Sequence, residues 1–157
     1  MERSLYGGTN GWDRDGHLGT PTINEIRNRI MDYAGDNLLL DDVEFTSDQI
    51  FQAIGHPIQE WESELPPLGY HYTTKTFPWR ERWAIATIGY LYRYASAYYS
   101  RNYMKNSGGG VSIEDKNKER EYLTRSQIML EEWRVWMKQK KIQLNGEQFY
   151  GTITGSY

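Results

Sequence analysis

Apolar residues recur at helical spacing in four stretches of the chain, and glycine, proline and polar residues separate these stretches. The first stretch begins near Pro21. Thr22 and Glu25 form a capping-box pattern there, in which each side chain accepts a hydrogen bond from the other residue's backbone amide. Gly35, which tolerates a left-handed backbone, is expected to end this first helix.

The second stretch repeats the same starting signal. Thr46 is followed by Gln49 at capping-box spacing, and buried apolar positions continue from there toward Pro66. A proline inside a helix removes one backbone hydrogen bond, and Pro57 lies two residues after Gly55. The pattern therefore predicts a second helix with a kink or a short break near Pro57.

The third and fourth stretches are longer. Residues 79–105 are apolar around much of the helical circumference, so this helix is expected to be central. Residues 112–141 carry one apolar stripe that includes Trp133 and Met137, with charged residues on the other faces. The sequence thus predicts an all-α fold, a bundle of about four main helices over residues 20–141.

Both ends of the chain depart from this pattern. Residues 1–19 hold five glycines and no apolar period, which indicates an extended N-terminal arm. Residues 142–157 mix aromatic residues, threonine and glycine, which favours an extended C-terminal arm. Because this tail is costly to leave in water, it is expected to dock onto another chain or to fold back on its own domain.

Composition limits the partners of the chain. The formal net charge is −3, so non-specific electrostatic binding to nucleic acid is not expected. There is no cysteine, and aromatic residues make up 15% of the chain. Tyrosine and tryptophan suit surfaces that are buried against partners, but they also fill helical cores, and both interpretations stay open.

We expect no membrane association, because the most apolar run, residues 83–99, is too short and too polar to span a bilayer.

The glycine-rich segment before the fourth helix raises the question of phosphate binding. Gly108, Gly109 and Gly110 lack the spacing of a phosphate-binding loop, and a helix rather than a strand precedes them. They are expected to reverse the chain between two helices, at an exposed tip that could contact a neighbouring protein.

No other pattern indicates chemistry. The three histidines, His17, His56 and His71, lie in separate segments without metal-ligand spacing, and the acidic residues around Asp42 do not fit a calcium loop. The serine-nucleophile signature is also missing. We therefore expect a protein without catalytic residues, metal or cofactor.

The order of the segments resembles the head-to-tail connector, or adaptor, proteins of tailed bacteriophages. The resemblance covers Pro21 to Gly151. The stretches that carry it are "PTINEIRNRIMDYAGDN", "DDVEFTSDQIFQAIGHPIQEWESELPP", "FPWRERWAIATIGYLYRYASAYYSRN", "GGVSIEDKNKEREY" and "EEWRVWMKQKKIQLN".

The resemblance implies a structural virion protein of the neck region, assembled in the host cytoplasm. Its copies would form a ring, commonly of twelve, between the portal protein and the tail or nozzle proteins, and DNA would pass through the channel without specific binding. No active site is carried over. The residues expected to contact partners are Phe149, Tyr150, Ile153 and Tyr157 of the tail, with Gly108, Gly109 and Gly110 at the tip.

Two other classes remain as alternatives. A small phage-encoded helical enzyme or regulatory factor would need a polar pocket lined by the histidines or glutamates. A nucleic-acid-binding module would show salt-sensitive binding to DNA, and the acidic balance of the chain disfavours it.

Overall fold

A computed structural model describes residues 19–37, 42–105 and 113–150. It contains four helices: α1 (Ile23–Ile30), α2 (Ser47–Ser63), α3 (Arg80–Lys105) and α4 (Ile113–Tyr150). The described residues include no strand, so the prediction of an all-α fold with four helices is confirmed.

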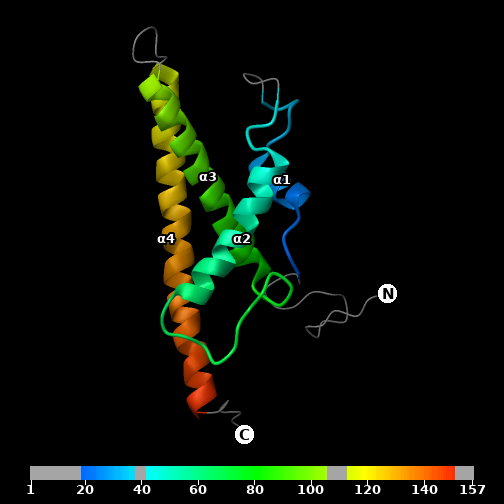
Figure 1. Ribbon diagram of the computed structural model, residues 1–157, viewed down its shortest axis with the longest axis vertical. Helices are drawn as coiled ribbons and strands as arrows, with labels where there is room; N and C mark the ends of the chain where they lie inside the picture. The colour runs from blue at the N-terminus through cyan, green and yellow to red at the C-terminus, as the bar shows by residue number, and fades with distance from the viewer. Residues whose placement is uncertain (1–18, 38–41, 106–112, 151–157) are drawn as a thin grey trace, which may run out of the picture.

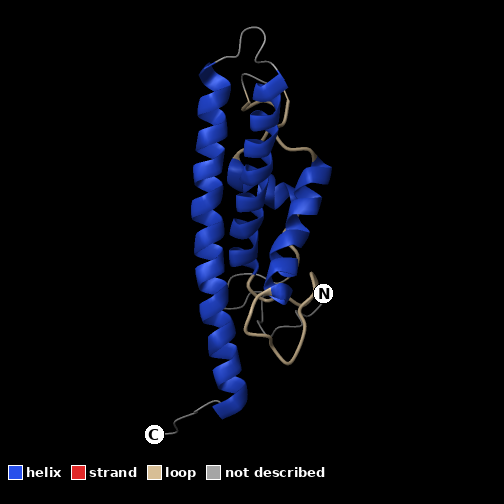
Figure 2. Ribbon diagram, turned by 60° about the vertical axis from the view of Figure 1, so that its left-hand side comes forward, coloured by secondary structure: helices blue, strands red, loops and turns tan. Residues whose placement is uncertain are grey.

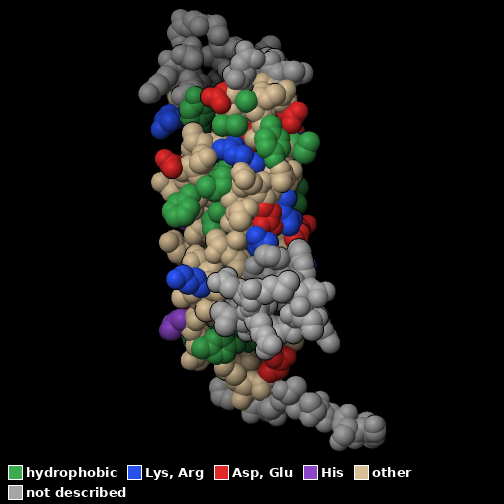
Figure 3. Space-filling view, turned by 90° about the vertical axis from the view of Figure 1, so that its right-hand side faces the viewer, with side chains coloured by type: hydrophobic (Ala, Val, Ile, Leu, Met, Phe, Trp, Pro, Cys, Tyr) green, Lys and Arg blue, Asp and Glu red, His purple; other side chains and the backbone are tan. Residues whose placement is uncertain are grey.

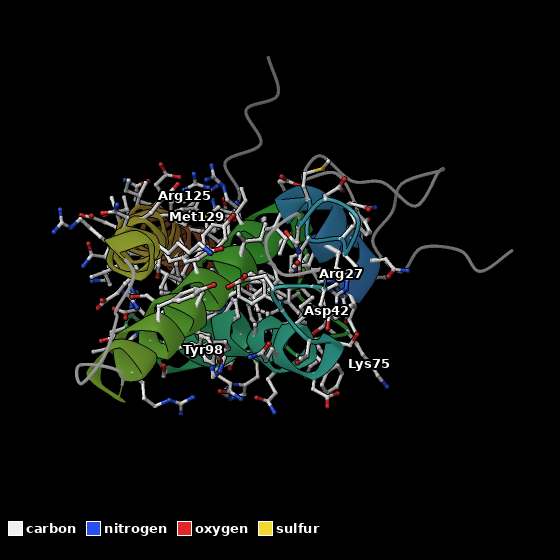
Figure 4. The ribbon with its side chains drawn as sticks, turned by 90° about the horizontal axis from the view of Figure 1, so that it is seen from above. Arg27, Asp42, Lys75, Tyr98, Arg125 and Met129 are labelled. Carbon is white, nitrogen blue, oxygen red and sulfur yellow. The ribbon has the colours of Figure 1, made fainter. Side chains whose placement is uncertain are left out.

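The third helix is central, as its sequence pattern predicts. Helix α4 lies along α3 in the opposite direction, and α2 crosses α3 on another side (Figures 1 and 2). Helix α1 packs on α2 and α3 (Figure 1). Figure 4, which looks down the bundle, shows Arg125 of α4 and Arg27 of α1 on opposite sides of α3.

Helix α1 starts where the sequence predicts and ends earlier. The Thr22–Glu25 capping box is present, with both reciprocal hydrogen bonds. The helix ends at Ile30, because Met31 takes a left-handed backbone conformation with φ 55°. The expected end at Gly35 is therefore wrong. The next residue, Asp32, is buried and bonded to several donors, and this tertiary anchor turns the chain before Gly35 is reached.

Helix α2 is continuous. The predicted capping box of Thr46 and Gln49 is confirmed, and the helix runs through Pro57 to Ser63 without the short break that the sequence suggests. One turn before the proline, the carbonyl of Ile54 accepts a hydrogen bond from the indole Nε1 of Trp83, at 2.7 Å. Packing of α3 against this part of α2 thus supplies a donor next to the position where proline removes one.

Helix α4 is longer than predicted. Residues 142–150 are helical, so the expected extended arm is wrong over these nine residues, and its remainder, 151–157, lies outside the described residues. Leu144 packs against the core one turn after Lys141. Gln143 donates to Glu147 at 2.8 Å, and Asn145 donates to the carbonyl of Lys141 at 3.1 Å. This i, i+4 pairing and core contact outweigh the weak local helix propensity of the segment.

Aromatic residues build the part of the core where the end of α2, the start of α3 and the middle of α4 meet. Neighbouring rings have centroids 5.1–6.4 Å apart, in tilted or edge-to-face arrangements. The members of this aromatic cluster are Trp61, Tyr72, Phe77, Trp79, Trp83, Trp133 and Trp136. Five of the chain's six tryptophans therefore serve the core of this chain.

Close approach of α3 and α4 depends on a glycine. A Cβ atom on Gly89 would lie 3.0 Å from Cδ2 of Leu130 and 3.2 Å from Cβ of Met129. A Cβ atom at this position would therefore require Leu130 or Met129 to shift by a few tenths of an ångström. Glycine at this position thus permits the two helices to pack closely.

The segment before α1 is tied to the start of α3. Arg80, which is buried, donates to the carbonyls of Gly19 and Thr20, at 3.1 and 3.3 Å, and to the carboxylate of Glu25. Burial lowers the pKa of Arg80, and the negative charge of Glu25 acts against this shift. These contacts fix residues 19–22 across the end of the bundle.

Candidate functional site

The predicted partner-binding residues lie at the ends of the described segments or outside them. Phe149 and Tyr150 are the last two residues of α4, and their side chains are outside the described part. Gly108, Gly109 and Gly110, Ile153 and Tyr157 also lie outside the described residues. Their role in binding therefore stays a prediction.

The densest polar contact between helices is centred on Glu60 of α2. Its Oε2 accepts from the hydroxyl of Tyr90 at 2.7 Å and from Nε1 of Trp133 at 3.0 Å, and its Oε1 accepts from Nε of Arg134 at 2.5 Å. The ring of His56, one turn earlier, stacks on Tyr90 with centroids 5.0 Å apart. Three helices thus meet at one carboxylate.

These groups are engaged with one another. Both oxygens of Glu60 already accept hydrogen bonds, and the bond to Glu60 raises the pKa of Arg134. Burial, together with the hydrogen bond to Glu60, raises the pKa of Tyr90 to about 12. A phenol with this pKa stays protonated near neutral pH, so it cannot serve as a base there. At neutral pH the Tyr90 hydroxyl therefore acts as a hydrogen-bond donor to Glu60.

The raised tyrosine pKa values predict a loss of stability at alkaline pH. Tyr90 and Tyr122 both have a pKa of about 12, mainly through burial, against 10.0 for a free phenol. The unfolded chain therefore releases these protons first, so their contribution to stability is complete below pH 10 and is lost as the pH rises toward 12. Ultraviolet titration should show late-ionising tyrosines, one fewer in Tyr90→Phe. Ionisation of every tyrosine near pH 10 in the folded protein would contradict this prediction.

The histidines lie apart. His71 contacts the Glu62 carboxylate through Nδ1 at 2.5 Å, on the connection between α2 and α3, whereas His56 lies within α2 on the Tyr90 ring. His17 is outside the described residues. In the described part of the chain, no group of three or more histidine, aspartate or glutamate side chains is arranged to hold a metal ion.

Asp32 organises the acidic loop between α1 and α2. Its carboxylate accepts from Nη1 of Arg27 at 2.9 Å and from Nδ2 of Asn37 at 2.8 Å. It also accepts from the backbone amides of Glu44 at 2.6 Å and Phe45 at 3.0 Å. Both oxygens of the Asp32 carboxylate thus accept hydrogen bonds from the surrounding residues, and these bonds hold the loop.

The feature that sequence reasoning missed is a row of exposed aliphatic side chains on α4. Ile128, Val135 and Ile142 are 54%, 51% and 62% exposed, and they follow one another every seven residues. Seven residues are close to two helical turns, so the three side chains lie on one face of the helix. We call these three residues the α4 row. The seven-residue spacing is visible in the sequence, beside the core stripe of the same helix.

Elements other than α4 also expose apolar residues. Met31, after α1, and Phe51, in the second turn of α2, are largely exposed. Figure 3 views the side of the molecule that lies on the right in Figure 1 and shows apolar side chains among charged ones over its upper half. Together with the α4 row, these residues are the candidate contact surfaces of the chain.

Comparisons with known proteins add no further assignment. Searches against protein families, curated proteins and solved structures give no match to this chain. Within the described residues, none of the helices combines the length and apolar character required to cross a bilayer.

Proposed function

We propose that the chain is a structural assembly protein, a head-to-tail adaptor that forms a ring between the portal and the tail or nozzle proteins of a bacteriophage. The resemblance of its segments to phage adaptors suggests this class. The observation that carries the proposal is the exposure of large apolar side chains both on α4 and on the α1–α2 part of one small helical bundle.

Two separate apolar surfaces suit an assembly in which each copy contacts two neighbours. Contacts between different faces of identical copies build rings when the rotation between copies closes. The α4 row provides one such surface, and the surface with Met31 and Phe51 provides the other. An adaptor of this kind needs neither a catalytic residue nor a cofactor, and the saturated contacts of Glu60 and Asp32 agree with that role.

The experiment combines the purified chain with the portal protein of the phage that encodes it. Native mass spectrometry should detect a complex with many copies of the chain on one portal, and electron microscopy should show a ring. A chain that stays monomeric and leaves the portal unbound, over a wide concentration range, would refute the proposal.

Removal of residues 151–157 provides a sharper variant. These residues include Ile153 and Tyr157, and they follow the end of α4. The truncated chain should keep its helical circular dichroism and its thermal transition but lose assembly on the portal. Equal assembly by the full and truncated chains would remove the tail from the interface.

A further inference from the structure

We propose that two free copies of this chain pair through the α4 row, with their α4 helices antiparallel and related by a two-fold axis that passes at Val135. The pair is a state of free copies and goes beyond the proposed ring, because a two-fold contact closes after two copies and cannot repeat around a ring. Since the ring uses the same α4 row, a pair separates before its copies enter the ring.

The first step of the argument is the position of the α4 row. Leu130, Trp133 and Met137 are buried against α3 and α2, whereas Ile128, Val135 and Ile142 project from the other side of the same helix. Figures 1 and 2 show that one long side of α4 faces no other described helix. A seven-residue repeat drifts by only about 20° per repeat around a straight helix, so the three side chains stay on this outer side.

The second step is the register. Ile128 and Ile142 are each seven residues from Val135. In an antiparallel pair centred on Val135, Ile128 of each copy therefore lies level with Ile142 of the second copy, and the two Val135 side chains meet at the axis. All six side chains of the two rows are then covered in this one register.

The third step is charge. At about 100° per residue, Glu131 and Lys138 fall on one margin of the row, and Glu132 and Gln139 fall on the other. In an antiparallel pair, the two-fold axis is perpendicular to both helices. The margin that carries Glu131 and Lys138 in one copy therefore faces the margin that carries Glu131 and Lys138 in the other copy. Lys138 is three residues after Val135 and Glu131 is four before it, so the two lie level within about one residue rise, ~1.5 Å.

The pair therefore gains two symmetric ion pairs, each between Lys138 of one copy and Glu131 of the other. Within one copy, neither Glu131 nor Glu132 has a cationic partner among the described residues. The Lys138 side chain is 58% exposed, with Nζ 3.6 Å from Glu64, so it can still reach a second copy.

The opposite orientation is disfavoured. In a parallel pair, unlike margins meet, which places Glu131 of one copy beside Glu132 of the other. Like charges at such positions are destabilising, and they would be repeated on both sides of the axis. The charges around the α4 row therefore select the antiparallel pair.

Cross-linking tests the register directly, because the chain has no cysteine of its own. With a short bis-maleimide, Val135→Cys should give covalent dimers by itself. Ile128→Cys and Ile142→Cys should each stay monomeric alone but give dimers when mixed. Gln52→Cys, on the exposed surface of α2, is the matched control for random collision and should not cross-link.

Charge reversal tests the ion pairs, with sedimentation equilibrium as the readout. Lys138→Glu or Glu131→Lys should each raise the dimer dissociation constant by about tenfold or more, and the double variant should return it toward the starting value. Because the α4 row is small, the wild-type pair is expected to be weaker than standard-size interfaces, which bury about 800 Å² per partner.

Several results would overturn the pairing. In the cross-linking experiment, these results are dimers of Ile128→Cys alone, or cross-linking of Gln52→Cys as strong as that of Val135→Cys. In the sedimentation experiment, they are a double charge variant whose dissociation constant stays raised, or a wild-type chain that stays monomeric at high concentration. None of these measurements uses a portal protein. A monomeric chain that still assembles on the portal would leave the proposed function standing and refute only the pair.

Discussion

Replacing Asp32 by alanine is expected to lower the free energy of unfolding by about 3–5 kcal/mol, the range for removing one partner of a buried ion pair. Arg27 would be left buried without its carboxylate, and the amides of Glu44 and Phe45 would lose their acceptor. For a chain of this length, a change of that size lowers the melting temperature by roughly 10 °C. Urea unfolding followed by circular dichroism measures it.

A matched control lies four residues further along the same loop. Asp36 is exposed, and its replacement by alanine should change the stability by less than about 0.5 kcal/mol. Asp32→Asn keeps the acceptor oxygens in part but not the charge, so its effect should lie between those of the two alanine variants. Equal effects of Asp32→Ala and Asp36→Ala would show that the buried carboxylate does not hold the loop.

The second large effect is expected for Trp133→Ala. This side chain is buried, its ring lies 5.3 Å from that of Trp136, and its Nε1 donates to Glu60. Removing a large buried aromatic residue costs about 3–5 kcal/mol, because the surrounding structure cannot fill the space that is left. Thermal unfolding of the variant should show the loss.

A conservative variant and a neighbouring control separate the causes. Trp133→Phe keeps an aromatic ring but not the N–H group, so it should cost less than alanine and still weaken the contact with Glu60. Val135→Ala, two residues away on the exposed face, should leave the unfolding free energy nearly unchanged. A large loss of stability in Val135→Ala would mean that the outer face of α4 belongs to the core of the single chain.

Local signals in the sequence predicted the helix starts well and the helix ends poorly. Both capping boxes could be read from residues three apart, because each motif is complete within one turn. The end of α1 at Met31 depends instead on Asp32 and its donors, which come from residues up to 13 positions away. No local pattern contains that information.

The same reasoning explains the fourth helix. Its last turns are helical because Leu144 reaches the core and polar side chains bridge successive turns, whereas composition alone suggested an extended arm. The contact at Glu60 could not be predicted from local sequence patterns, since its donors lie 30, 73 and 74 residues away along the chain. The α4 row, by contrast, is a regular local spacing and could be read from the sequence.

The shortness of α1 has a consequence for how the molecule opens. An eight-residue helix is too short to be stable by itself in water, so its backbone hydrogen bonds persist only while Arg80 and Asp32 keep their partners. Its amide protons should therefore exchange with solvent together with those of the following loop, as one cooperative unit. The α3–α4 hairpin, with its long shared surface, would keep its protons until the whole domain unfolds.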